Sequence, residues 1–152
     1  MVDDVTIDKT TFALPPYKFE AGTPDIVGTI GFGQAIDYVN SVGIDNIASY
    51  EQDLLKYATE QLKKIDGLRI IGEAQHKAGV ITFVGDGCNS GDIGELLAIK
   101  GMCVRTGKHC AHPLLYRMGV TSTVRMSFGM YNTFEEIDLF IKALKKVISQ
   151  LK

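Results

Sequence analysis

The chain has 152 residues, of which 45% are hydrophobic and 22% charged, an ordinary globular composition with enough apolar surface for one core. Its 16 basic and 18 acidic residues give a net charge of -2 and are spread along the chain, without the basic blocks that favour nucleic-acid or anionic-membrane binding. No apolar run approaches the roughly 18 residues of a membrane span, and the N-terminus is acidic where a signal peptide is basic. Composition therefore predicts a cytoplasmic protein with no nucleic-acid or membrane partner.

The cysteines support the same compartment. Cys88, Cys103 and Cys110 are an odd number and lack the spacing of a disulfide scaffold, which favours free thiols in a reducing environment. We expect Cys88 and Cys103 to be small apolar fillers of the core.

The first 25 residues differ in character from the rest. Val5–Ile7 and Thr10–Phe12 favour extended structure, and the two prolines that follow exclude a helix. Asp25 can then cap a helix over 26–42, where apolar residues recur at helical spacing. The sequence thus predicts an extended arm over 1–25 and a domain over 26–152.

The remaining elements follow from periodicity, β-branched content and caps. In chain order they are a helix over 44–65, strands over 68–71 and 80–84, a helix from Asn89 or Ser90 to Ile99, a strand over 102–105, a short helix over 113–118, a strand over 123–128 and a helix ending at Leu151. Thr133 and Glu136 form a capping box at the start of the last helix. This order predicts an α+β fold with a small, mostly antiparallel sheet covered on one face by helices.

The loop over 106–113 carries the strongest chemical signal. Cys110 lies between His109 and His112, and Arg105 lies five residues upstream. A thiol reacts as its thiolate, which neighbouring imidazolium or guanidinium groups stabilise. The loop therefore predicts a nucleophilic cysteine, and it looks like the nucleophile loop of a sulfur-transfer enzyme.

A second arginine, Arg125, lies within an apolar strand-like run. A guanidinium in such surroundings needs an anionic partner. We expect that partner to be the carboxylate of a ligand, although an Asp or Glu side chain is an alternative for both arginines.

Three motifs together resemble one family. Arg-Thr-Gly-x-His-Cys-Ala followed by Pro-Leu at 105–114, Arg-x-Ser-x-x-x-Tyr-Asn-Thr at 125–133, and Phe-Glu-Ala-Gly-Thr-Pro at 19–24 stand in the order found in class V, fold-type I pyridoxal-phosphate enzymes. The resemblance is to the C-terminal part of SufS-type (group II) cysteine desulfurases and spans nearly the whole chain.

The resemblance implies roles for the residues on the substrate side. Cys110 would take sulfur from L-cysteine as a persulfide and release L-alanine, while Arg125 would bind the substrate carboxylate. Arg105 and His109 would lie beside them. A sulfur-acceptor protein of iron–sulfur cluster assembly would be the partner.

For the cofactor, the resemblance implies a shared site in a homodimer. Gly22 and Thr23 match the segment that reaches the pyridoxal phosphate of the neighbouring subunit, whereas the family's Schiff-base lysine, preceded by histidine, belongs to a large domain that precedes the part matched here. The only His-Lys pair, His76–Lys77, falls in a link between two strands. We therefore expect a fragment, with residues 1–25 ending the missing large domain, that alone binds no cofactor and is inactive.

Other functions are compatible with the same residues. Selenocysteine lyase, another class V aminotransferase, or a non-catalytic module that binds a sulfur acceptor are alternatives within this resemblance. A zinc site of Cys103, His109, Cys110 and His112 is an alternative of another class, disfavoured because adjacent ligands point differently.

Overall fold

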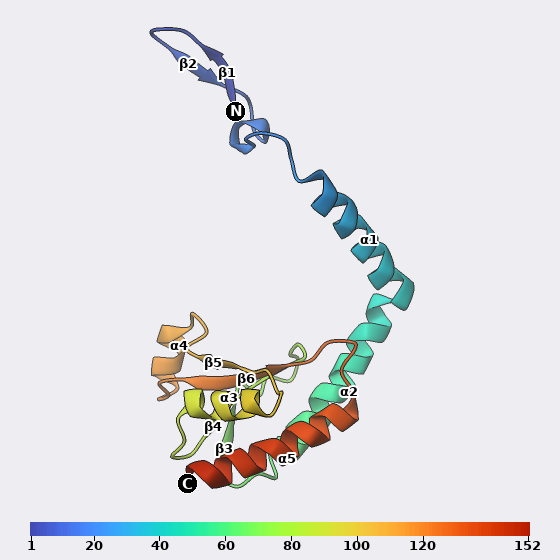
Figure 1. The fold of residues 1–152 in the computed structure, drawn as a ribbon, viewed down its shortest axis with the longest axis vertical. Coiled ribbons are helices and arrows are strands. Elements are labelled where there is room, and N and C mark those ends of the chain that lie inside the picture. Colours follow the sequence, from blue (N-terminus) through green and yellow to red (C-terminus); the bar gives the residue numbers. More distant parts are fainter. The chain divides into compact units, whose positions relative to one another are not determined.

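The computed structural model describes all residues from 1 to 152, and the chain forms two compact units, Met1–Ile44 and Asp45–Lys152 (Figure 1). The predicted boundary at residue 25 concerns the domains of longer enzymes and stays a prediction. None of the helices combines the length and the apolar content needed to cross a bilayer.

The first unit is a hairpin followed by a helix. Strands β1 (Val2–Val5) and β2 (Thr10–Phe12) pair antiparallel, a short 3-10 helix η1 (Tyr17–Phe19) follows, and α1 spans Ile26–Val42. The Asp25 side chain accepts a hydrogen bond from the Gly28 amide at 2.8 Å, which confirms the predicted cap. No residue of α1 is buried, so its apolar side chains form no core within this unit.

The second unit carries the remaining elements in the predicted order. They are α2 (Ile44–Leu62), β3 (Leu68–Ile71), β4 (Val80–Gly85), α3 (Ser90–Ile99), β5 (Arg105–Gly107), α4 (His112–Arg117), β6 (Thr123–Ser127) and α5 (Phe134–Leu151). The sheet order is β3-β4-β6-β5, and every neighbouring pair is antiparallel. The predicted α+β architecture with a small antiparallel sheet is confirmed.

One face of this sheet forms the core. Ile81 and Phe83 of β4 lie opposite Met126 and Val124 of β6, and all four side chains are buried. They pack with buried residues of α2, α3 and α5, which include Leu54, Ala58, Leu62, Ile93, Leu97, Leu144 and Val147. Each buried leucine, isoleucine, valine, phenylalanine or methionine side chain among them stabilises the fold by about 1.5–3 kcal/mol relative to an exposed one. Because side chains alternate along a strand, the residues between them face away from this core.

The predicted strand over 102–105 is wrong except at its last residue, because β5 begins at Arg105. The Met102 amide instead donates to the Leu97 carbonyl at 3.0 Å, at the end of α3. A cavity of about 150 Å³ separates residues 102–104 from the end of β6.

The expectation that Cys103 fills the core is also wrong, since Cys103 is exposed. Cys88 is half-buried, and all three thiols are free.

The end of the second arginine motif has a structural role. Asn132 accepts a hydrogen bond from the Gly129 amide at 2.8 Å, donates to the Glu136 carboxylate at 3.0 Å, and its carbonyl accepts from the Tyr50 hydroxyl at 2.7 Å. Thr133 and Glu136 form the predicted capping box, with hydrogen bonds of 3.2 and 2.9 Å. The hydrogen bonds from Asn132 and from the Thr133 amide lower the pKa of Glu136. These contacts fix the connection from β6 to α5.

Thr133→Ala should lower the free energy of unfolding by about 1 kcal/mol, because it leaves an amide at the start of α5 without its acceptor. Thr133→Ser keeps the hydroxyl and should retain most of the stability. Urea unfolding of the two variants and the unmodified chain measures the difference. Equal stability of the alanine variant and the unmodified chain would show that the cap contributes nothing.

Candidate active site

The site begins with the register of the three strands β4, β6 and β5. Arg125 of β6 lies opposite Thr82 of β4 on one side and opposite Arg105 of β5 on the other. Side chains of directly opposed residues share a face of the sheet. Since Val124 and Met126 face the core, Arg105 and Arg125 lie together on the opposite, open face.

The two arginines have no protein partner for their charge. Neither guanidinium forms an ion pair, and the ion pair in the structure joins Lys63 to Glu73 elsewhere. Like charges directly opposite one another destabilise a sheet. An anion between them would remove that repulsion, and a carboxylate matches the planar fork of a guanidinium. The alternative that Asp or Glu side chains pair with these arginines finds no support.

Three neighbouring residues on this face have buried polar atoms without a hydrogen-bond partner. The atoms are Arg125 Nε, Thr123 Oγ1 and both ring nitrogens of His109. Thr123 precedes Arg125 by two positions in β6 and therefore shares its face; it is 0% exposed. Buried polar groups almost always have partners, so an unpartnered group indicates that a ligand or a rearrangement supplies one. Sequence inspection did not single out Thr123, because a threonine in a strand carries no chemical signal by itself.

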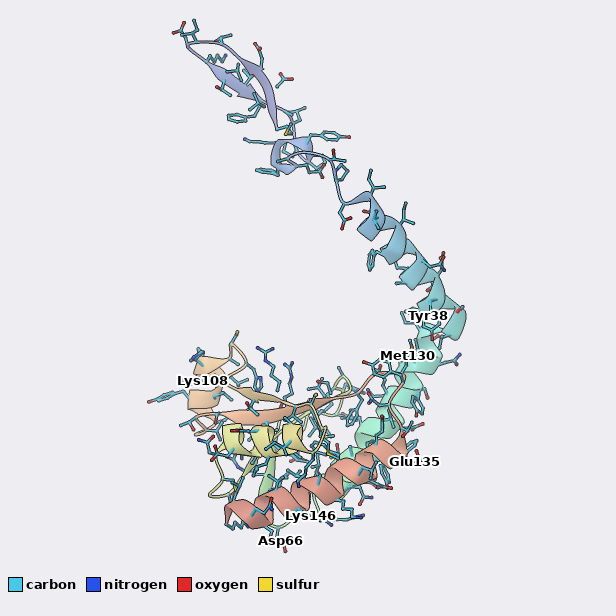
Figure 2. The ribbon with its side chains drawn as sticks, in the orientation of Figure 1. Tyr38, Asp66, Lys108, Met130, Glu135 and Lys146 are labelled. Atoms are coloured by element: carbon cyan, nitrogen blue, oxygen red, sulfur yellow. The ribbon has the colours of Figure 1, made fainter.

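The predicted nucleophile lies on a strained turn. The Ala111 amide donates to the Lys108 carbonyl at 2.9 Å, and the two central residues, His109 and Cys110, have φ values of 53° and 59°. Positive φ at both central positions is typical of a type I′ turn, which glycine, asparagine and aspartate normally occupy. Each residue with a β-carbon there costs about 1–2 kcal/mol. Strain of this kind is found at functional sites. Cys110 is exposed on the turn, which begins at Lys108, labelled in Figure 2.

The surroundings of His109 favour its neutral imidazole form. Burial lowers its pKa below 6.5, the nearby charges of Arg125 and Arg105 lower it further, and the Thr123 backbone opposes the shift. Although the Thr123 backbone lies close enough to act on the ring, neither ring nitrogen makes a well-formed hydrogen bond. The arginines are therefore the permanent cations of this face.

The remaining predicted residues lie elsewhere. Gly22 and Thr23 belong to the first unit and are exposed, with Gly22 at a φ of 77°. No three His, Cys, Asp or Glu side chains come together as a metal site would need, so the zinc alternative lacks structural support. His112 begins α4 and, with Lys108 and Tyr116, lines a separate cavity of about 290 Å³.

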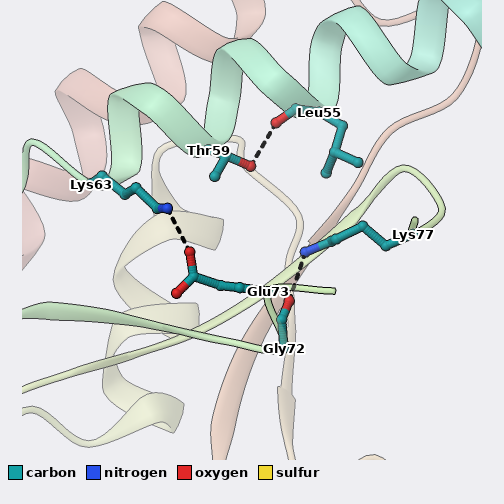
Figure 3. Close-up of polar contacts among 6 residues, drawn as sticks. All are labelled: Leu55, Thr59, Lys63, Gly72, Glu73 and Lys77. Carbon is teal, nitrogen blue, oxygen red and sulfur yellow. Dashed lines mark hydrogen bonds and ion pairs between the residues drawn. The ribbon is translucent and has the colours of Figure 1, made fainter. Parts of the chain in front are cut away.

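Lys77 has the surroundings of a structural residue. Its ammonium group donates to the Gly72 carbonyl at 3.1 Å, close to the Lys63–Glu73 ion pair (Figure 3). Burial lowers the pKa of Lys77. The adjoining cavity, about 330 Å³, is lined by α2 and the link between β3 and β4, and neither the nucleophile turn nor the arginine pair contributes to it.

The site lies within a stretch that contains no carboxylate. Between Glu95 and Glu135 the sequence has no Asp or Glu but five cationic residues: Lys100, Arg105, Lys108, Arg117 and Arg125. The other residues therefore carry 11 basic and all 18 acidic side chains. The expectation of evenly spread charge is wrong for this stretch, which creates a local positive potential that attracts anions.

Comparison with known proteins places the chain in a family. Residues 1–140 match the profile of the Aminotransferase class-V family. The chain belongs to this family. The predicted family is thus confirmed, whereas the comparisons do not distinguish the SufS-type subgroup.

Relatives of this class-V chain are named cysteine desulfurases. The chain is 52% identical to a "Probable cysteine desulfurase" of Xylella fastidiosa; the match covers 97% of this chain and 35% of that relative. It is 45% identical to a "Cysteine desulfurase" of Synechococcus elongatus, and this match covers 97% of this chain and 24% of that relative. The crystal structure of the cysteine desulfurase CsdA from Escherichia coli superposes with a TM-score of 0.89 at 34% identity, covering 100% of this chain and 38% of that one. The chain thus spans between 24% and 38% of the length of these relatives.

The lowered pKa of His109 makes stability depend on pH. Below about pH 6.5 the unfolded chain binds a proton that the folded His109 resists, so the free energy of unfolding should fall as the pH decreases through this region. His109→Gln should lose this component, because glutamine does not bind a proton in this pH range. Urea unfolding between about pH 7.5 and about pH 5 measures both profiles. If the free energy of unfolding depended on pH in the same way in the unmodified chain and in His109→Gln, the lowered pKa of His109 would be contradicted.

Proposed function

We propose that this chain is the C-terminal, thiol-bearing part of a pyridoxal-phosphate-dependent cysteine desulfurase of the SufS type, which supplies sulfur for iron–sulfur cluster assembly. The observation that carries the proposal is the unpaired arginine pair, Arg105 and Arg125, on the open face of the sheet whose strand β5 leads into the Cys110 turn. Residues 1–25 would belong with the preceding large domain and 26–152 with the small domain.

Arg125 would bind the carboxylate of L-cysteine. Its guanidinium faces away from the core and has no ion-pair partner, so two of its N–H groups can donate to the two carboxylate oxygens. Arg105, directly opposite, would add a second positive charge. His109, neutral and half-buried beside them, would border the substrate without competing for its carboxylate.

Cys110 would accept the sulfur. Its thiolate attacks the sulfur of the substrate, a sulfur–sulfur bond forms, and the carbon–sulfur bond of the substrate breaks with its electron pair remaining on carbon. That carbon takes up a proton and becomes the methyl group of L-alanine, while Cys110 keeps the persulfide. The exchange is balanced and needs no external oxidant. The exposed, strained turn presents the thiol for attack and for the later release of sulfur.

Pyridoxal phosphate, when bound, would withdraw electrons from the carbon framework of the substrate so that the carbon–sulfur bond can break. This chain provides little to hold it. Gly22, with open space around its α-carbon, and Thr23 suit a close approach to the phosphate of a partner subunit in a homodimer. Lys77 lies away from the arginine pair, so we expect the 152 residues alone neither to hold the cofactor nor to turn over cysteine.

The second substrate would be a sulfur-acceptor protein. Tyr116 of α4 is 90% exposed, and Lys108 and Arg117 lie in the same carboxylate-free stretch as the exposed thiol of Cys110. Such a surface suits an acceptor with an acidic face. The free thiols agree with action in the reducing cytoplasm.

A segment exchange tests the function directly. The chain aligns with 147 residues of the Xylella fastidiosa relative, so it can replace that segment while the rest of the relative supplies the remaining domain. Cysteine-dependent alanine formation is expected from the exchanged protein. Cys110→Ala should abolish sulfur transfer, because no other group takes the sulfur, while the absorbance of the bound cofactor stays unchanged.

Cys103→Ala is the matched control. Cys103 is also an exposed free thiol and lies only two residues before Arg105. Its loss should leave the rate of sulfur transfer within about twofold, well below the tenfold change that 1.4 kcal/mol would produce. Full sulfur transfer by Cys110→Ala, or its loss in Cys103→Ala, would overturn the assignment of the nucleophile.

A further inference from the structure

The unpartnered polar atoms beside Arg125 have complementary hydrogen-bonding capacities. The Nε–H of Arg125 can only donate, the hydroxyl of Thr123 can both donate and accept, and the neutral ring of His109 has one nitrogen that accepts. One arrangement gives a partner to three of these four atoms: Arg125 Nε–H donates to the Thr123 hydroxyl, and that hydroxyl donates to the unprotonated ring nitrogen of His109. The hydroxyl can take the central position because it both accepts and donates.

The backbone places the three residues so that this link can form. Thr123 and Arg125 share a face of β6, and the residue opposite Thr123 is Gly107, which has no side chain to cover it. Thr123 is nevertheless 0% exposed, and its backbone acts on the His109 ring. His109 follows Gly107 by two positions, at the base of the nucleophile turn, and the Thr123 backbone is near enough to its ring to oppose the lowering of its pKa.

We propose that Thr123 is a positioning residue that connects Arg125 to His109, its hydroxyl accepting from Arg125 Nε–H and donating to the unprotonated ring nitrogen of His109. The link fixes which ring nitrogen carries the proton and holds the orientation of the imidazole next to Cys110. It also couples the arginine that would bind the substrate carboxylate to the turn that carries the thiol. The inference deepens the proposed function and rests on it for the role of the site.

Nitrogen NMR of the histidine side chains tests the link in the 152-residue chain. At neutral pH His109 should show one tautomer, with one protonated and one unprotonated ring nitrogen, rather than a mixture. Thr123→Val has nearly the same shape but no hydroxyl, and should convert His109 to a mixture of tautomers. Thr123→Ser should restore the single tautomer. A mixture in the unmodified chain, or one tautomer in the valine variant, would overturn the proposal.

Thr121→Val is the control for the substitution itself. Thr121 precedes Thr123 by two residues but is exposed, so its hydroxyl should have no influence on His109. The His109 spectrum of this variant should match that of the unmodified chain. A change as large as that of Thr123→Val would show that the effect is not specific to the buried hydroxyl.

A second measurement uses the thiol. The rate of alkylation of Cys110, followed by mass spectrometry of its peptide, should change severalfold in Thr123→Val and in His109→Gln, and the double variant should behave like His109→Gln alone. If the change in alkylation rate of the double variant equalled the product of the changes in the two single variants, the link between Thr123 and His109 would be overturned. Neither measurement requires turnover, so an active Cys110→Ala exchange protein would refute the proposed function without affecting these results.

Discussion

The position of Arg105 directly opposite Arg125 is the constraint on which the site depends. Two guanidinium groups on neighbouring strands repel each other, and the fold offers neither of them a carboxylate. The repulsion is tolerated because Arg105 is exposed to solvent, where its charge is screened. A bound carboxylate would turn the same pair from a source of instability into a binding site, as the proposed function requires.

The same strand builds both the core and the site. In β6, Val124 and Met126 point into the apolar core, and Thr123 and Arg125 point to the other face. The core therefore determines where the arginine lies: a shift of one residue in register would bury Arg125 and expose Val124. The Asn132–Thr133–Glu136 network then fixes the end of this strand against α5.

Much of the fold could be predicted from the sequence, because its signals are local. The Thr133–Glu136 box and the Asp25 cap depend on residues three apart, and both formed as expected. The start of β5 could not be predicted, since it depends on a hydrogen bond from Met102 back to α3 and on pairing with β6.

The sequence identified most of the residues of the candidate site, but it could not predict how they are arranged in space. The motifs identified Cys110, Arg105, Arg125 and His109. The juxtaposition of the two arginines depends on strand register, and the lowered pKa of His109 depends on its burial beside them. Thr123 has no distinguishing sequence feature, and only its burial without a partner draws attention to it.

The residue that receives the sulfur can be identified directly. The exchanged protein is incubated with pyridoxal phosphate and L-cysteine without reductant and digested, and the masses of its cysteine peptides are measured. One additional sulfur atom is expected on the peptide that contains Cys110 and none on those that contain Cys88 or Cys103. Alanine formation with the sulfur on another cysteine, or with Cys110 unmodified, would contradict the assignment of Cys110 as the nucleophile.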